Sequence, residues 1–257
     1  MEGWKTFHFS GQYGIVDIMR LCASQLTKDF RHRTIVKNAT FSIHPGEVVT
    51  IFGPNGAGKT TLIKILATLL KPTSGKLEIE GTDAIADASN VRGAVGVVIH
   101  ENLAYPSFSP YENLTFFGQM YGVKQLEHRA TTLLAEVGLQ RFLHEPLRIF
   151  SRGMMQRFMI ARALLHHPSV LLLDEPFSGL DVPAQQVVLE RIAREQQKGT
   201  GIVITTHNTE LGYLVGTRFL FMLNGELDEV AQKDEIEAET LRRTYEERLT
   251  NNAPRGL

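Results

Sequence analysis

The chain has 257 residues, of which 43% are hydrophobic, so it can bury the core of one large α/β domain or of two small ones. Its 27 lysines and arginines nearly balance 28 aspartates and glutamates, and this balance argues against a nucleic-acid-binding protein or a binder of anionic membranes. The single cysteine, Cys22, excludes an intramolecular disulfide, and there is no Cys/His cluster at metal-ligand spacing.

The first ten residues, MEGWKTFHFS, lack the continuous apolar run of a secretory signal. No later run approaches the ~20 apolar residues that cross a bilayer. We therefore expect a chain that is soluble in its own right, so that any membrane-spanning part must belong to another chain.

A glycine-rich segment, GPNGAGKTT at 53–61, follows the apolar run VVTIF at 48–52. The residues after it, 62–69, carry leucine and isoleucine at helical spacing, so the context is strand, loop, helix. The pattern G-x-x-x-x-G-K-[ST] in this context predicts a loop that binds nucleotide phosphates. A glycine-rich turn with a chance lysine is the alternative.

Each residue type in this loop has a physical role in binding phosphate. The glycines let the backbone turn its N–H groups inward at the positive end of a helix. Lys59 adds a positive charge for the β- and γ-phosphates, and the Thr60 hydroxyl is placed to ligate Mg²⁺. The predicted nucleotide-binding residues of the loop are Gly53, Pro54, Asn55, Gly56, Ala57, Gly58, Lys59, Thr60 and Thr61.

Two further apolar runs end in functional side chains. Residues 170–173, VLLL, predict a strand buried on both faces, with Asp174 and Glu175 at its carboxyl end, where open α/β sheets bind ligands. Asp174 is predicted to reach Mg²⁺, and Glu175 to act as general base on the water that attacks the γ-phosphate. After SGLD at 178–181 and a predicted helix to about Lys198, the run GIVITT ends before His207, predicted to bond a γ-phosphate oxygen. Solvated acids and an ordinary loop histidine are the alternatives.

The signature segment, FSRGMMQR at 150–157, lies just upstream of LLLDEP. In this order and spacing, the phosphate loop, the signature segment, LLLDEP, SGLD and TTH resemble the nucleotide-binding subunit of ATP-binding-cassette (ABC) transporters over roughly residues 16–230. The resemblance implies an α/β P-loop NTPase with a mixed β core, a RecA-like subdomain and an inserted helical signature subdomain at about 101–165. It also implies ATP, Mg²⁺, a membrane-spanning permease subunit and a head-to-tail dimer with two composite sites.

In that family the signature segment usually reads LSGGQ and meets the γ-phosphate held by the other subunit. Ser151 is predicted to cap the helix, and Gly153 to permit close backbone approach. Arg152 stands where glycine is common, and Met154 where glutamine is common. The form S-R-G-M-x-Q-R resembles exporter-type cassettes, including the haem-exporter ATPase of cytochrome c maturation, and implies export.

Two other site predictions depend on the resemblance. The run LTKDF at 26–30 looks like the family's adenine-stacking loop with Phe30 in place of tyrosine, although a core aromatic is the alternative. The family's metal-contacting glutamine is replaced by His100 or Glu101. Because a carboxylate is a better Mg²⁺ ligand than a neutral imidazole, the predicted metal residues are Thr60, Asp174 and Glu101.

The predicted organisation is an N-terminal extension at 1–15, an ATPase domain at 16–232 and a charged, solvated helical tail at 233–257. Lys59, Glu175 and His207 are the predicted catalytic residues. The resemblance implies an ATPase that drives export through ATP-dependent dimerisation, bound at the inner face of the cell membrane, with no nucleic-acid partner. A cassette ATPase that acts on a soluble assembly, as in iron–sulfur biogenesis, is the alternative, and a nucleotide switch that barely hydrolyses is a more distant one.

Overall fold

The computed structural model describes residues 19–99, 101 and 104–252. Ten strands of this part of the chain form a sheet in the order β5-β4-β1-β2-β10-β9-β3-β8-β7-β6. The strands are β1 (Leu21–Phe30), β2 (Arg33–Ile43), β3 (Val48–Phe52), β4 (Ser74–Ile79), β5 (Thr82–Asp83), β6 (Val95–Val98), β7 (Val170–Asp174), β8 (Gly201–Thr206), β9 (Arg218–Leu223) and β10 (Glu226–Gln232). The helices are α1 (Lys59–Leu66), α2 (Ala88–Val91), α3 (Pro110–Met120), α4 (Leu126–Glu136), α5 (Arg152–Ala163), α6 (Val182–Gln197), α7 (Thr209–Val215) and α8 (Ala238–Asn252).

The centre of the sheet is parallel, because β3, β8, β7 and β6 pair in the same direction. Their side chains alternate between two cores, as the period of a strand requires. Leu172 and Val203 pack with α1 on one face, whereas Leu171 and Ile202 pack with α5 and α6 on the other. Burial on both faces is the physical reason for the uninterrupted aliphatic runs in the sequence.

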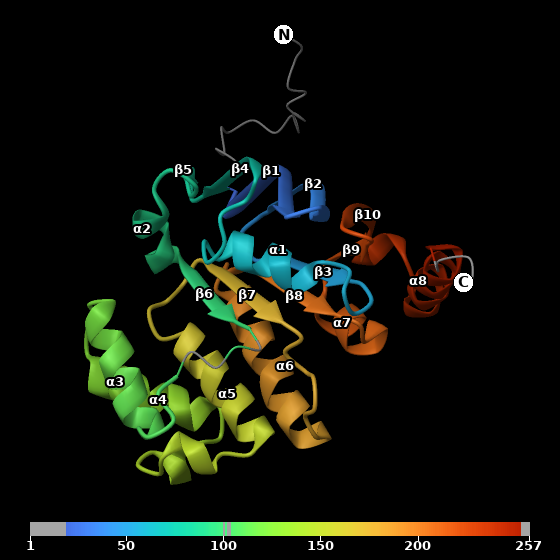
Figure 1. Cartoon of the computed structure of the whole chain (residues 1–257). Helices are drawn as coiled ribbons and strands as arrows, with labels where there is room; N and C mark the ends of the chain where they lie inside the picture. The colour runs from blue at the N-terminus through green and yellow to red at the C-terminus, as the bar shows by residue number, and fades with distance from the viewer. Residues whose placement is uncertain (1–18, 100, 102–103, 253–257) are drawn as a thin grey trace, which may run out of the picture.

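The strands β1, β2, β4 and β5 are antiparallel and lie across α1 from the parallel strands (Figure 1). Helix α1 is thus enclosed between the two parts of the sheet, which are joined where β10 pairs with β2. Helices α3, α4 and α5 gather at the other end of the molecule (Figure 1). The predicted fold class, a P-loop α/β fold with a mixed sheet, is confirmed.

Three helices fall in the interval 101–165, for which the sequence predicts a helical subdomain. Helix α3 begins at a capping box, in which the Ser109 hydroxyl accepts from the Glu112 N–H and the Glu112 carboxylate accepts from the Ser109 N–H. The predicted extension at 1–15 lies outside the described residues. Within the described ranges, no helix is both long and apolar enough to cross a bilayer.

The C-terminal tail is a helix, as predicted, but one face of it is buried and not solvated. In this helix, α8, Leu241 and Tyr245 are buried against Phe52, Phe219 and Phe221. These two residues are four apart, so they lie on one face of the helix and cover the side of β3 and β9. The apolar spacing within a charged segment is the signal that the prediction missed.

Candidate functional site

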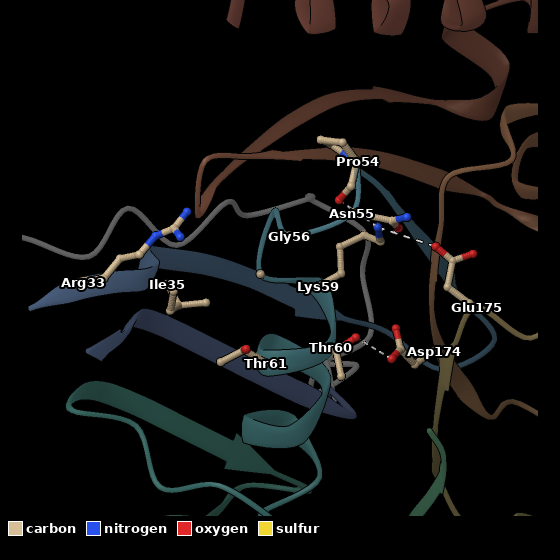
Figure 2. Close-up of a pocket in the computed structure, with 11 residues that line it drawn as sticks. Arg33, Ile35, Pro54, Asn55, Gly56, Lys59, Thr60, Thr61, Asp174 and Glu175 are labelled. Atoms are coloured by element: carbon tan, nitrogen blue, oxygen red, sulfur yellow. Dashed lines mark hydrogen bonds and ion pairs between the residues drawn. The ribbon is translucent and has the colours of Figure 1, made fainter. Parts of the chain in front are cut away.

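The carboxyl ends of three parallel strands meet at one edge of the sheet. Phe52 at the end of β3 pairs with Thr206 at the end of β8, and Asp174 at the end of β7 pairs with Thr205. The segments that follow β3 and β7, together with the start of β2, form a cavity of about 430 Å³ (Figure 2). It is lined by Arg33, Ile35, Pro54, Asn55, Gly56, Gly58, Lys59, Thr60, Thr61, Asp174 and Glu175.

The phosphate loop, residues 53–61, requires glycine for two different reasons. Gly58 has a φ of 109°, and a Cβ atom there would lie 2.6 Å from the carbonyl oxygen of Ile35. A Cβ atom on Gly53 would lie 2.5 Å from the carbonyl oxygen of Met222. Gly58 is also the N-cap of α1 and brings no side-chain acceptor, so the first N–H groups of this helix are available to an anion.

Lys59 is held inside the loop by oxygen atoms of the same chain. Its ammonium donates to the carbonyl oxygens of Gly53, at 2.6 Å, and Pro54, at 3.2 Å. It also lies 3.5 Å from Oε1 of Glu175. Lys59 is only 6% exposed, but these oxygen atoms balance its charge. Because Lys59 lines the cavity, phosphate oxygens bound there would replace these acceptors.

Asp174 is fixed by two hydroxyl groups. The Thr60 hydroxyl donates to Oδ2 at 2.7 Å, and the Thr205 hydroxyl donates to Oδ1. The structure therefore brings together Thr60 and Asp174, two of the three predicted metal residues, whereas the part played by Thr205 was not predicted. No group of three or more metal-binding side chains occurs in the described part of the chain. The two hard oxygen donors of Thr60 and Asp174 fit Mg²⁺ and would hold it when nucleotide is bound.

Glu175 lies at the mouth of the cavity between Lys59 and His207. The Nδ1 atom of His207 is 3.0 Å from both carboxylate oxygens of Glu175. The Glu175 backbone has a φ of 50°, in the left-handed region, and its N–H donates to the carbonyl oxygen of Thr205 at 2.9 Å. Such a backbone costs about 1–3 kcal/mol in a residue other than glycine and is typical of functional sites. It turns the carboxylate toward the phosphate loop.

Glu101 is not among the residues that line the cavity. Its carboxylate pairs with the ammonium of Lys64, which lies one helical turn beyond Thr60 on α1. The structure thus does not bring Glu101 to Asp174, and its role as a metal ligand stays a prediction. His100, the other residue considered for this role, lies outside the described residues.

Three further predicted residues, Phe30, Ser151 and Gly153, do not line this cavity. Phe30 is 47% exposed at the end of β1, with the ammonium of Lys28 5.2 Å from its ring centroid. Ser151 caps α5 as predicted, since its hydroxyl accepts from the N–H of Met154 at 3.2 Å. Ser151 and Gly153 do not line the phosphate cavity of their own chain.

The sequence did not predict the contacts of Arg152 or the position of Arg33. The Arg152 guanidinium donates to the hydroxyl of Ser178 at 3.0 Å and lies over Gly179, so it ties the start of α5 to the SGLD loop. Arg33 and Ile35 on β2 line the phosphate cavity. No motif marks these positions, and only the fold places them there.

The fold and the site define a P-loop ATPase. The ABC transporter family matches residues 36–178 of this chain. The linearmycin resistance ATP-binding protein LnrL of Bacillus subtilis is 32% identical over 218 residues, which are 84% of this chain and 70% of LnrL. The spermidine/putrescine import ATP-binding protein PotA of Pseudomonas fluorescens is 34% identical over 208 residues, which are 78% of this chain and 56% of PotA.

A solved structure of the ATP-binding subunit of an ABC transporter is 30% identical and superposes with a TM-score of 0.81. The superposition covers 88% of this chain and 98% of the chain in the solved structure. The chain therefore belongs to the ABC transporter family, as an ATP-binding subunit and an ATPase.

Proposed function

We propose that this chain is the ATPase subunit of a membrane exporter and that it hydrolyses Mg-ATP in a head-to-tail dimer. The observation that carries the proposal is the position of Glu175, which lies between the phosphate-loop lysine, Lys59, and His207. This arrangement suits an attack by water on the terminal phosphate, because hydrolysis needs charge stabilisation and a positioned water more than covalent chemistry.

The ion pair between Lys59 and Glu175 gives a physical account of how nucleotide binding prepares the base. Phosphate oxygens attract the Lys59 ammonium away from Glu175, so the carboxylate becomes available to accept the proton of a water molecule. His207 keeps that carboxylate oriented and can bond a γ-phosphate oxygen with its other nitrogen. Thr60 and Asp174 would hold Mg²⁺, which offsets negative charge on the β- and γ-phosphates when bound.

The dimer is proposed because Ser151 and Gly153 lie outside their own chain's cavity. The N-terminus of α5 is exposed, so the N–H groups of its first turn that Ser151 does not satisfy are available to an anion held by another molecule. In a head-to-tail pair, the signature segment of each copy would cover the phosphate cavity of the other. The ATP between the copies would then be part of the interface.

A membrane partner is proposed from the helical part of the chain. Tyr105, Phe108 and Phe116 are 37–45% exposed and form a cluster, with ring centroids 5.4 Å apart for Tyr105–Phe108 and 5.1 Å apart for Tyr105–Phe116. Exposed aromatic groups of this kind mark docking surfaces. Two neighbouring aromatic residues, Tyr111 and Phe117, are half-buried, whereas Tyr121 is 46% exposed and stacks on His166. We infer that the cluster receives a segment of a membrane-spanning subunit at the inner face of the membrane.

The export direction rests on the S-R-G-M-x-Q-R form alone, and haem export is the narrowest interpretation of that form. The names of LnrL and PotA assign linearmycin resistance to one and spermidine/putrescine import to the other. Neither name favours haem, so we propose export and assign no substrate to it.

Affinity purification from detergent-solubilised cells tests this proposal. The tagged Glu175→Gln chain, kept in Mg-ATP, is expected to recover a membrane-spanning protein. The same chain with Phe116→Asp, matched for ATP binding, is expected to lose it. Recovery of soluble proteins only would contradict transport and favour an ATPase that acts on a soluble assembly.

A further inference from the structure

Arg33 is placed at the nucleotide cavity by the turn that joins β1 to β2. It is the first residue of β2 and pairs with Phe30 across the hairpin. Because side chains two residues apart in a strand share a face, Arg33 and Ile35 lie together on the cavity wall. Figure 2 shows them on the side of the phosphate loop opposite Asp174 and Glu175.

The charges that line the cavity give Arg33 a distinct position. They are two cations, Arg33 and Lys59, and two anions, Asp174 and Glu175. The Lys59 ammonium is already balanced by Glu175 and by two carbonyl oxygens. The Arg33 side chain is exposed, and within the described ranges its guanidinium makes no hydrogen bond or ion pair. Without it, the lining would carry a net negative charge, which opposes the entry of a polyphosphate.

We propose that Arg33 is a nucleotide-binding residue whose guanidinium contacts the α- or β-phosphate from the β2 side, opposite Lys59. A guanidinium presents several N–H donors in a planar fork that matches phosphate oxygens, and it stays charged at every relevant pH. Arg33 lines the phosphate cavity and pairs across the hairpin with Phe30, the predicted base-stacking residue, so a nucleotide that reaches both would pass close to it. The inference rests on the phosphate loop being the nucleotide site.

The chain offers a matched control two residues away. Arg31 is also an exposed arginine, but it lies in the turn and does not line the cavity. Arg31→Gln and Arg33→Gln therefore remove the same charge from the same hairpin, and only the second removes it from the cavity. Lys59→Ala tests the phosphate loop itself, and Arg33→Lys keeps the charge while it removes the fork.

The experiment is equilibrium binding of ATP, ADP and adenosine to these four variants by calorimetry, with melting temperatures measured in parallel. Arg33→Gln is expected to bind ATP and ADP about 10- to 150-fold more weakly, as the loss of one charge-assisted bond implies, and adenosine unchanged. Arg33→Lys should recover part of the loss, and Arg31→Gln should bind as the natural chain does. In steady-state hydrolysis, the KM of Arg33→Gln should rise while kcat stays within about twofold.

Two results would overturn the proposal. If Arg33→Gln binds ATP no more weakly than Arg31→Gln, while Lys59→Ala does lose ATP, the phosphate loop remains the site and Arg33 is not part of it. If Arg33→Gln loses adenosine as strongly as ATP, its contact is not with phosphate. Unchanged ATP binding by Lys59→Ala would instead remove the nucleotide site, and the inference on Arg33 with it.

Discussion

The phosphate loop and the signature segment each place backbone N–H groups at the start of a helix, but their surroundings differ. The loop lies in a cavity, and its helix α1 has no side-chain cap. The signature segment lies at the surface, and Ser151 caps its helix α5. The first region brings Lys59, Thr60 and Glu175 together in one chain, whereas the second contains none of these residues. The difference agrees with the proposed site of two halves, in which each chain holds one phosphate cavity and supplies its signature segment to another copy.

The largest effect is expected at the phosphate cavity, from the substitution Glu175→Gln. Glutamine keeps the size of the side chain but cannot accept the proton of water, so kcat should fall by about 10²–10⁴-fold, the range for loss of a general base. ATP should still bind, because Lys59 and the loop backbone are intact. Phosphate release measures the first effect, and equilibrium binding measures the second. A variant that hydrolyses ATP at the natural rate would remove Glu175 from its proposed role.

The proposed role of the signature segment in another copy's site is tested by two substitutions of Ser151. Ser151→Asp preserves the helix cap but adds a negative charge where a phosphate is proposed to lie, so hydrolysis should fall by about tenfold or more, with little change in stability. Ser151→Ala should cost about 1 kcal/mol of stability through the lost cap. Steady-state hydrolysis and thermal unfolding separate these effects. Normal hydrolysis by Ser151→Asp would show that this helix end faces no phosphate.

A smaller effect is expected at the metal side of the cavity. The hydroxyls of Thr60 and Thr205 both donate to Asp174, but only Thr60 is proposed to ligate Mg²⁺. Thr60→Val should raise the Mg²⁺ concentration for half-maximal hydrolysis by about tenfold or more, because one ligand is lost. Thr205→Val, which removes only an orienting bond, should raise it less. Equal effects of the two substitutions would contradict the assignment of Thr60 as the ligand.

The smallest effect concerns the far end of the signature helix. His166 stacks on Tyr121 with ring centroids 4.1 Å apart, and its Nε2 lies 3.1 Å from the carbonyl oxygen of Val95. Its Nδ1 is buried with no partner among the described residues. Burial lowers the pKa of His166 from its ordinary value of 6.5.

Because the folded chain resists protonation of His166 and the unfolded chain does not, this residue stabilises the fold above pH 6.5, and the contribution is lost as the pH falls through and below that value. Thermal unfolding at pH 7.5 and at pH 5.5 tests the sign. His166→Gln, which keeps an N–H donor for Val95 and does not titrate, should lose less stability between the two. An equal loss in both chains would exclude a contribution from His166.

The sequence predicted the half of the site whose residues follow parallel strands. Aliphatic runs mark β3, β7 and β8, and the carboxyl ends of adjacent parallel strands share one edge, so Gly53, Asp174 and His207 had to meet there. Ser151 was predicted as a cap because capping depends on residues three apart in the chain.

The interactions that the sequence did not predict depend on elements far apart in the chain. Thr205 reaches Asp174 through the register of β7 and β8, and Glu101 forms an ion pair with Lys64. Arg33 lines the cavity because the β1–β2 hairpin lies across α1, and no local pattern encodes that contact. Such contacts follow from tertiary packing, which periodicity and motifs do not specify.

The central claim, that two chains complete each ATP site, is tested most directly by the molar mass of Glu175→Gln in solution. Light scattering with and without Mg-ATP should show a dimer only with Mg-ATP, and the double variant Glu175→Gln, Ser151→Asp should stay monomeric while it still binds ATP. A Glu175→Gln chain that remains monomeric at saturating Mg-ATP, or a double variant that dimerises equally well, would contradict the claim.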